Sequence, residues 1–395
     1  MVQQSHNNLS RWFGAIMVAA CCTVASLPTT SHAVTVADHA GLADALRHIG
    51  EHPPTAVNQD KHMDFPTLME TLAQNRVVFV GETHDRYGDH LNQLAVLQAL
   101  QQRNPNLAIG VEWFQQPFQG VLNDYLAGKI SESDMLSRSG YYERWRYDYR
   151  LLRPIMEFAK ANHLPVIALN AQVELTRKVS QGGLEALTPA ERAQLPAIIN
   201  PPDASYRERL EKVFAQHSKD KREFDNFLLV QRIWDETMAH NIARYLQAHP
   251  QHQMVVFSGS GHISYDVGIP QDLARQMPDI KLATVTSSAA KEVEPGMVDY
   301  FLLSEALDLP PTGKLGVMLD EKDNALNIIA LDTDSAAGKA GLQQGDHLAS
   351  VNGTHIHSMA DLKLALSAFK PGDKVSVTVE RQGKPKPLAY NVTLR

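Results

Sequence analysis

The stretch that decides the fold is Val77-Val78-Phe79-Val80-Gly81-Glu82-Thr83-His84. A short apolar run that stops at a glycine is typical of a buried β-strand. The stretch Val255-Val256-Phe257-Ser258-Gly259-Ser260-Gly261-His262 repeats this arrangement much later in the chain. In both stretches the pattern Gly-x-x-His directly follows the apolar run. We therefore predict two buried strands, each of which ends in a glycine and a histidine.

The region from residue 65 to residue 305 continues this alternation. Apolar runs of the same kind occupy residues 107–111, 166–169 and 282–285. Between the runs, helical patterns cover residues 90–102, 151–162 and 224–248. Buried strands that alternate with helices predict an α/β domain, with a mostly parallel sheet and helical cover. The charged stretch 189–221, which is interrupted by prolines, suggests a helical insertion or lid.

Four titratable residues lie where the predicted strands stop. They are Glu82, His84, Glu112 and His262. In open α/β sheets ligands bind beyond the carboxyl ends of the strands, so we expect these residues to share one site. Two imidazoles and two carboxylates can bind a divalent metal or act as acid and base in catalysis. The alternative is a structural role, as helix caps or core histidines.

Several other kinds of site are missing from the sequence. The Gly-x-Ser-x-Gly elbow of hydrolases is absent, since Ser258 and His262 stand where its glycines would be. Neither a Walker loop nor a Gly-x-Gly-x-x-Gly motif follows the first strand, which argues against nucleotide binding. The net charge is −7, and without the one charge of residues 1–33, on Arg11, it is −8. This balance does not favour nucleic acid or an anionic membrane as a partner.

A dense aromatic and basic cluster occupies residues 141–150, whose sequence is YYERWRYDYR. Tyrosinate can ligate haem iron, and arginine pairs well with carboxylates such as the haem propionates. The candidate haem-binding residues are Tyr141, Tyr142, Trp145, Arg146, Tyr147 and Tyr149. The alternative is an exposed aromatic and basic surface, or a helix start that packs on the sheet.

The chain begins with the features of an export signal. Arg11 precedes an apolar run over residues 12–27, which is shorter than the ~20 residues of a membrane-spanning helix. We expect cleavage after Ala33, which gives a signal peptide of residues 1–33 and a periplasmic or envelope protein. The alternative is a lipoprotein signal, in which Cys21 is lipidated and anchors the protein in the outer membrane. Cys21 and Cys22 are the only cysteines, so a disulfide scaffold after residue 33 is excluded.

The remaining regions complete the predicted organisation. Residues 34–64 are weakly patterned and form a lead-in segment. A proline-containing linker at residues 306–313 separates the α/β domain from a small, mainly β domain at residues 314–395. That domain has strand patterns at 315–319, 326–330, 347–351, 374–380 and 388–394, and one helical pattern at 359–368.

Five segments of the α/β region, taken in order, resemble the ChaN-like haem-uptake family of the Tiki superfamily. They are residues 78–84, 110–114, 145–154, 234–239 and 258–262. The resemblance implies an envelope protein that binds haem through a tyrosine, sometimes between two subunits, and so a possible homodimer. Of the four tyrosines, Tyr149 is slightly favoured because it lies within a family-like segment. Tiki proteins are metal-dependent proteases with two Gly-x-x-His motifs, and erythromycin-esterase-like relatives use similar histidines as bases. The resemblance thus also implies a hydrolase or peptidase as an alternative function, and a non-catalytic envelope scaffold is a third.

The C-terminal region resembles a bacterial PDZ domain. The similarity lies in residues 334–353, DSAAGKAGLQQGDHLASVNG. The resemblance implies a groove that receives a peptide C-terminus beside an added strand. The residues in the place of its carboxylate-binding loop are Lys314, Leu315, Gly316 and Val317. The alternative is a PDZ-like domain without a peptide ligand, which serves as a rigid docking piece.

Overall fold

The computed structural model of the protein describes residues 41–58, 61–215, 221–288, 296–322 and 325–395. These residues form two compact units. The first unit contains the described residues up to Ala127 and Tyr149–Asp308, and the second contains Gly128–Asp148 and Leu309–Arg395. The expected signal peptide, residues 1–33, lies outside the described residues. Within the described ranges, none of the helices has the length and apolar character needed to span a membrane.

The first unit is built on an eight-stranded sheet with the order β2-β1-β8-β7-β3-β6-β4-β5. The six strands from β8 to β5 are parallel, whereas β1 and β2 are antiparallel at one edge. This arrangement confirms the mostly parallel sheet predicted from the sequence. The strands are β1 (Ala56–Asn58), β2 (Lys61–Met63), β3 (Val77–Glu82), β4 (Leu107–Gln115), β5 (Val166–Asn170), β6 (Gln253–Gly259), β7 (Leu282–Ser288) and β8 (Tyr300–Leu303).

The central strands are buried along their whole length. Every residue of β3, β4 and β6 is buried. Strands covered on both faces have no polar face, which is why they appear in the sequence as continuous apolar runs. In the register of β3 and β6, Glu82 lies opposite Gly259, so the two Gly-x-x-His motifs leave the sheet side by side.

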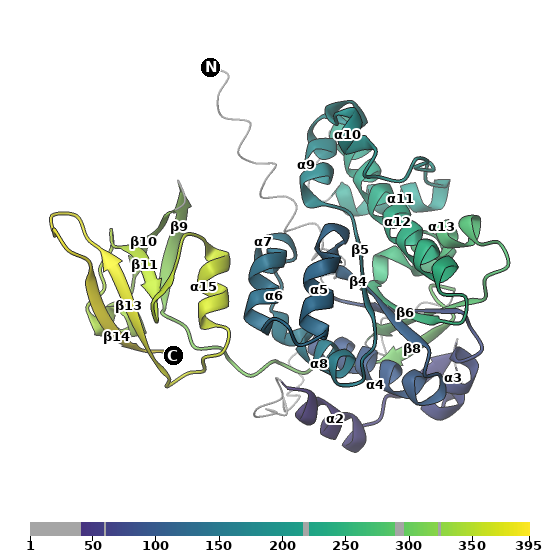
Figure 1. Cartoon of the computed structure of the whole chain (residues 1–395), viewed down its shortest axis with the longest axis horizontal. Coiled ribbons are helices and arrows are strands. Elements are labelled where there is room, and N and C mark those ends of the chain that lie inside the picture. Colours follow the sequence, from purple (N-terminus) through teal and green to yellow (C-terminus); the bar gives the residue numbers. More distant parts are fainter. Residues whose placement is uncertain (1–40, 59–60, 216–220, 289–295, 323–324) are drawn as a thin grey trace. The chain divides into compact units, whose positions relative to one another are not determined.

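Helices cover both faces of this sheet (Figure 1). On one face, α12 and α13 pack against Phe79, Ala108 and Val256 in a shared hydrophobic core. On the other side, α4 contacts β3 and β7, and α5 contacts β5. The helices of this unit are α2 (Leu42–Glu51), α3 (Phe65–Leu72), α4 (Tyr87–Arg103), α5 (Gln119–Leu126), α8 (Arg153–Ala161), α9 (Val173–Gly182), α10 (Pro189–Arg192), α11 (Ala204–Phe214), α12 (Lys221–Ala248) and α13 (Ile269–Gln276).

The lead-in segment differs from the sequence-based expectation, whereas the charged stretch contains helices as predicted. The described part of the lead-in segment, residues 41–64, forms α2 and the edge strands β1 and β2, so it belongs to the first unit. The charged stretch at 189–221 contains the helices α10 and α11, with an irregular segment between them. Pro196, Pro201 and Pro202 lie in that segment, where they prevent one continuous helix.

The second unit contains a separate antiparallel sheet with the order β14-β13-β11-β10-β9, to which β12 adds beside β11. Its helices α14 and α15 lie between the sheet strands in the sequence, whereas α6 and α7 come from the segment Gly128–Asp148. The elements are β9 (Val317–Lys322), β10 (Ala325–Leu331), β11 (His347–Val351), β12 (Thr354–His355), β13 (Lys374–Glu380), β14 (Leu388–Thr393), α6 (Glu132–Ser139), α7 (Tyr141–Arg144), α14 (Ala336–Ala340) and α15 (Met359–Leu366). The predicted small, mainly β domain is thus present.

Candidate functional site

The structure brings together the four titratable residues predicted at the strand ends. His84 Nδ1 lies 2.8 Å from Glu82 Oε1, and His262 Nε2 lies 3.4 Å from Glu112 Oε1. Each of the four residues is at most 6% exposed. They meet because β3, β6 and β4 are neighbours in the sheet, in that order. The topology therefore makes one buried site from residues that are up to 180 positions apart in the sequence.

Gly259 allows the two halves of this site to approach each other. A Cβ atom at this position would lie 2.8 Å from His84 Cε1, which is closer than side-chain atoms tolerate. The backbone N–H of Gly259 also donates a 2.8 Å hydrogen bond to Glu112 Oε2. The glycine of the second Gly-x-x-His motif therefore contacts both the histidine of the first motif and the glutamate of β4.

Glu82 forms the centre of a first group, with an imidazole on each oxygen. His84 Nδ1 lies 2.8 Å from Oε1, and His90 Nδ1, from α4, lies 2.7 Å from Oε2. Burial raises the pKa of Glu82, but the two imidazoles outweigh it and hold this pKa well below its usual range. Burial lowers the pKa of His90, but Glu82 raises it to about 9. A carboxylate at Nδ1 favours the proton on that nitrogen, so Nε2 of His84 is arranged as a base.

His262 forms the centre of a second group, between two carboxylates. Its Nδ1 lies 2.6 Å from Asp235 Oδ1, and Glu112 is on the side of Nε2. Burial lowers the pKa of His262, but Glu112 and Asp235 raise it to about 10. Burial likewise raises the pKa of Glu112, but His262 brings it below its usual value. At neutral pH His262 is therefore a charged imidazolium that can donate a proton.

A network of buried groups positions Asp235. Tyr206, from α11, donates a 2.6 Å hydrogen bond to Asp235 Oδ2. Arg232 donates to the same oxygen at 3.3 Å and makes two 2.7 Å bonds to Asp272 of α13. Burial raises the pKa of Asp272 to about 7, although Arg232 opposes this shift. Tyr206 of α11 and Arg232 of α12 thus hold Asp235, which belongs to a helix and not to a sheet strand, in place beside His262.

Three residues of this site were not predicted from the sequence: His90, Asp235 and Tyr206. Asp235 lies inside one of the segments quoted for the family resemblance, at residues 234–239, which was the only available signal. His90 and Tyr206 lie on helices, and a helical pattern alone does not show which polar residue faces the strand ends. Only the packing of α4, α11 and α12 reveals them.

The metal-binding role predicted for Glu82, His84, Glu112 and His262 receives no support from the geometry. Over the residues that the structure describes, no group of three or more His, Cys, Asp or Glu side chains is arranged to hold a metal ion. The carboxylates of Glu82 and Glu112 instead face imidazole nitrogens or backbone N–H groups. The imidazoles and carboxylates of the site are thus paired with one another.

The aromatic and basic cluster is divided between the two units. Tyr141, Tyr142, Trp145, Arg146 and Tyr147 belong to the second unit, whereas Tyr149 belongs to the first. Tyr149 has no exposed surface, and Tyr141 is 1% and Tyr142 8% exposed. Tyr147 is half-buried, with its ring centre 5.6 Å from that of Trp145. Tyr147 is thus the candidate tyrosine with the largest access to solvent.

The four residues of the predicted carboxylate-binding loop precede and begin β9. Leu315 is buried in the core of the small domain, Lys314 and Gly316 are exposed, and Val317 starts the strand. All four line a pocket of about 420 Å³ that also contacts Leu362 and Leu366 of α15. The loop, the strand and the helix are therefore placed as a peptide groove requires.

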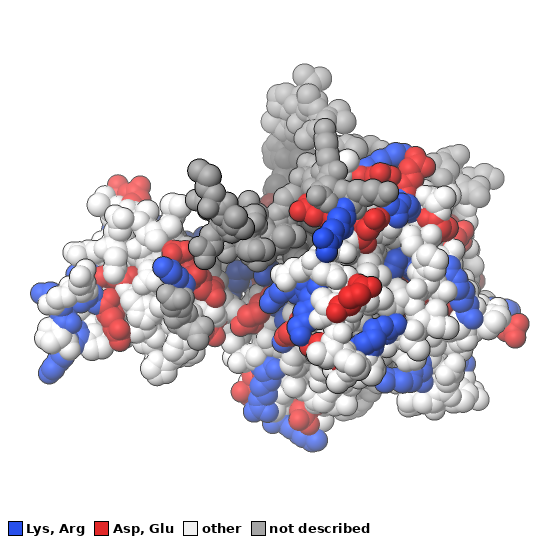
Figure 2. Space-filling view, turned by 90° about the horizontal axis from the view of Figure 1, so that it is seen from above, with Lys and Arg blue, Asp and Glu red and all other residues white. Residues whose placement is uncertain are grey.

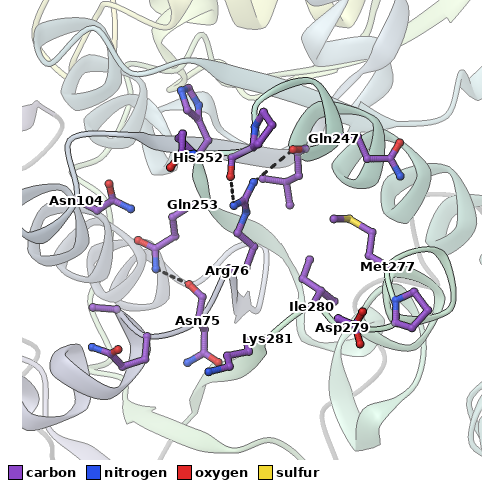
Figure 3. Close-up of a pocket in the computed structure, with 16 residues that line it drawn as sticks. Asn75, Arg76, Asn104, Gln247, His252, Gln253, Met277, Asp279, Ile280 and Lys281 are labelled. Atoms are coloured by element: carbon purple, nitrogen blue, oxygen red, sulfur yellow. Dashed lines mark hydrogen bonds between the residues drawn. The ribbon is translucent and has the colours of Figure 1, made fainter.

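A third feature, a polar pocket of about 730 Å³, lies at the amino-terminal ends of β3, β6 and β7 (Figure 3). Here Arg76 donates hydrogen bonds to the carbonyl groups of Leu246, His249 and Pro250, which follow the last turn of α12 or belong to it. These contacts satisfy carbonyls that a helix end leaves without partners. The Arg76 contacts in this pocket therefore stabilise the end of α12. The pocket lies at the opposite end of the strands from the paired histidines.

Comparison with known proteins identifies both units. The model of the family described as haem-binding uptake, Tiki superfamily, ChaN matches residues 68–273, and a PDZ-domain model matches residues 313–392. A solved structure of ChaN of Campylobacter jejuni with cofacially bound haem has a TM-score of 0.52 at 16% identity, and the match covers 64% of this chain and 98% of that one. At this identity the likeness shows the fold.

Curated relatives match shorter parts of the chain. The periplasmic pH-dependent serine endoprotease DegQ of Escherichia coli (strain K12) is 40% identical over 60 residues, 15% of this chain and 13% of DegQ. A probable periplasmic serine endoprotease, DegP-like, of Brucella suis biovar 1 is 30% identical over 142 residues, 35% of this chain and 25% of that protein. The chain thus spans a quarter or less of the length of these two relatives. Since the first family model covers more than half of its residues, this protein belongs to the ChaN family of haem-binding uptake proteins in the Tiki superfamily, with a PDZ domain following the ChaN-like region.

Proposed function

We propose that this protein binds haem in the bacterial envelope as part of haem or iron uptake, and that its PDZ domain binds the C-terminus of a partner protein. The observation that supports haem binding most directly is the membership of the ChaN family. The side chains at the aromatic and basic cluster fit such a ligand. Tyr147 is half-buried, Trp145 lies beside it, and Arg146 is exposed.

Each of these residues has a distinct part in the proposed haem site. The Tyr147 phenolate supplies an oxygen ligand for ferric iron, and the Arg146 guanidinium pairs with a propionate carboxylate. The Trp145 indole offers a flat apolar surface to the porphyrin. Bound haem supplies an iron centre that the protein carries as cargo or cofactor. Tyr149 and Tyr141 are buried, so a role as ligand would require them to leave their present packing.

The test is a hemin titration of the chain that starts at residue 34. We expect a Soret band that grows to a fixed stoichiometry, and we expect Tyr147→Phe to lose the tyrosinate spectrum because only the hydroxyl is removed. Tyr149→Phe is the matched control and should keep the spectrum. The absence of any spectral change at micromolar hemin contradicts haem binding. Loss of the spectrum in Tyr149→Phe alone would transfer the ligand role to that residue.

The proposed peptide binding rests on the small sheet. Strand β9 ends the order of this sheet and pairs on one side, with β10, in the part of the chain that the structure describes. Its other edge therefore offers backbone N–H and C=O groups to an added strand. Gly316, in the carboxylate-binding loop, has a φ of +72°, a conformation that glycine adopts readily.

A second candidate function is hydrolysis at the buried histidines. One specific observation favours it. Two histidine–carboxylate groups share the site, and one is arranged to accept a proton whereas the other is arranged to donate one. His84 is arranged as a base by Glu82, while Glu112 and Asp235 keep His262 protonated. A histidine placed to accept a proton beside one that is protonated is an arrangement that general acid–base catalysis uses. The metal-dependent peptidase of the Tiki type is the variant of this function that needs an added ion.

A panel of chromogenic esters and peptides tests this second function, with and without EDTA. If the histidines act by proton transfer, His84→Gln and His262→Gln should each lower turnover by about 10²- to 10⁴-fold. His163→Asn, which changes an exposed histidine outside the site, is the control. Loss of turnover in EDTA would favour the metal-dependent variant. Turnover that is absent, or unchanged in both histidine variants, contradicts a catalytic role.

We propose an envelope location on the basis of residues 1–33. Cleavage after Ala33 would give a periplasmic protein, and lipidation of Cys21 would give an anchored one. The mass of the mature N-terminus in a bacterial host distinguishes these outcomes. Light scattering measures the molar mass of the same material with and without hemin. The comparison tests for a haem-linked dimer, since the ChaN resemblance implies that haem can join two subunits.

A further inference from the structure

The peptide groove of the PDZ domain has an additional wall. The pocket of about 420 Å³ between β9 and α15 is lined on one side by residues of the segment Gly128–Asp148. This segment precedes the PDZ domain by more than 160 positions in the sequence but belongs to the same compact unit. The residues that it contributes are Tyr142, Arg146 and Asp148. A PDZ groove that consists of a loop, a strand and a helix is thus extended here by residues from the ChaN-like region.

Contacts with α15 hold this wall in place. Both α6 and α7 contact α15, and the three helices lie together in Figure 1. Lys363, on α15, donates a hydrogen bond from Nζ to the Arg146 carbonyl oxygen, with a distance of 3.3 Å. Arg146 has a φ of +72°, which is unusual for a residue other than glycine. Such backbone conformations persist where the surroundings fix them, and they occur often at ligand-binding positions.

The charges around the pocket are unbalanced. Three cationic side chains line it, Arg146, Lys314 and Lys363, against one carboxylate, Asp148. Burial and the Arg146 guanidinium lower the pKa of Lys363, although Asp148 opposes them. Arg146 and Lys363 therefore repel each other, and an anionic ligand would relieve this repulsion.

Most of the remaining lining is apolar. Leu315 is buried beneath it, and Leu319, Leu362 and Leu366 contribute further apolar surface. An apolar floor with cations at its rim suits a peptide whose last side chain is apolar. The terminal carboxylate of such a peptide accounts for one negative charge, at the loop that contains Lys314. A second negative charge on the ligand would match the remaining cations.

We infer that the PDZ groove and the segment Gly128–Asp148 form one composite site, in which Arg146 selects peptide C-termini that carry an acidic residue upstream of an apolar last residue. This inference rests on the proposed peptide binding and adds its specificity. Arg146 contacts the ligand's acidic side chain, and Lys363 positions Arg146 through the carbonyl group. A bound peptide and a haem propionate therefore compete for the Arg146 guanidinium. The ChaN-like region thereby takes part in choosing the partner of the PDZ domain.

Peptide selection followed by charge exchange tests this inference. A library of C-terminal heptapeptides is selected on the chain that starts at residue 34, and the best binder is synthesised with Glu, Gln or Lys at its upstream position. We expect enrichment of Asp or Glu at one upstream position and a three- to tenfold tighter binding of the Glu peptide than of the Gln peptide. Arg146→Gln should abolish this difference, so that the Glu and Gln peptides bind this variant with equal affinity. Arg146→Glu should prefer the Lys peptide.

Controls separate this inference from the proposed function on which it rests. Arg138→Gln removes an exposed arginine of α6 that does not line the pocket, and it should bind all peptides as the wild type does. Peptide binding without acidic preference, or a preference that survives Arg146→Gln, overturns the inference but keeps the peptide groove. If C-terminally amidated peptides bind equally well, or no peptide binds, the groove itself is wrong. Displacement of the peptide by hemin, with hemin binding lost in Lys314→Ala, would assign the pocket to haem.

Discussion

At the scale of single residues, the most informative side chain is His262. Its two ring nitrogens face Asp235 at 2.6 Å and Glu112 at 3.4 Å, in an environment that is nearly closed to solvent. A buried charge is costly unless it is paired, and here one imidazolium lies between two carboxylates. The charge on His262 is thus part of what keeps Glu112 and Asp235 stable inside the fold.

This arrangement predicts a specific dependence of stability on pH. The pKa of His262 is about 10 in the folded protein against 6.5 for the ordinary side chain. A raised pKa stabilises the fold fully below pH 6.5, and this stabilisation is lost as the pH rises toward 10. The wild type should therefore be more stable than His262→Gln at pH 7, and this difference should shrink by at most ~1.4 kcal/mol per pH unit above that.

Urea unfolding at pH 7, 8, 9 and 10 measures this difference. Trp234 is a suitable fluorescent reporter, since its ring centre lies 6.3 Å from that of His262. A difference in unfolding free energy that stays constant or grows across this range contradicts a charged, buried His262.

The same scale shows which parts of the site the sequence could predict. Glu82, His84 and His262 directly follow apolar runs, and Glu112 ends the apolar part of another, so parallel topology alone brings them together. Asp235 and Tyr206 lie in helices, where polar residues are common on the solvent side. Their position at the site depends on how α11 and α12 pack, which no local pattern encodes.

At the scale of elements, burial on both faces explains what was predictable. The central strands β3, β4 and β6 have no solvent-facing residues, so their apolar runs are distinct. By contrast, β1 has three residues and β8 has four, too few to show a periodic pattern. In the small domain β13 alternates in burial, and Gly345, Gly353, Gly372 and Gly383 lie between successive strands, which helped to show the strand positions in the sequence.

The helical segment Gly128–Asp148 shows how local signals can fix elements without fixing their partner. Ser131 and Asp134 form a capping box that starts α6, and Gly140, with a φ of +60°, ends it. These caps set both ends of α6, and Gly140 separates it from α7. Whether the helices pack on the parallel sheet or on the PDZ domain is not determined by the caps.

At the scale of the whole molecule, sequence families and compact units divide the chain differently. The ChaN family model covers residues 68–273 without interruption, so it includes the segment Gly128–Asp148. In the structure this segment belongs to the unit that contains the PDZ domain. The face of the molecule in Figure 2 shows acidic and basic side chains interspersed among its described residues. Within the second unit, the pocket beside Arg146 is lined by three cationic side chains and one carboxylate.

This division predicts the effect of removing the PDZ domain. In a chain that ends at Asp308, α6 and α7 lose α15, which contacts both of them. Hydrogen exchange measured by mass spectrometry should therefore become faster for residues 132–144 than in the full chain, since exchange reports local opening. Peptides from β3 and β6 are the internal control and should keep their protection, because their hydrogen-bonded neighbours all lie in the first unit.

Unchanged protection of α6 and α7, with the control peptides also unchanged, would show that these helices depend on the ChaN-like unit instead. Faster exchange in both regions would mean that the truncated chain does not fold, and α6 and α7 would then be compared in the full-length variant Lys363→Met, where the bond to the Arg146 carbonyl is absent.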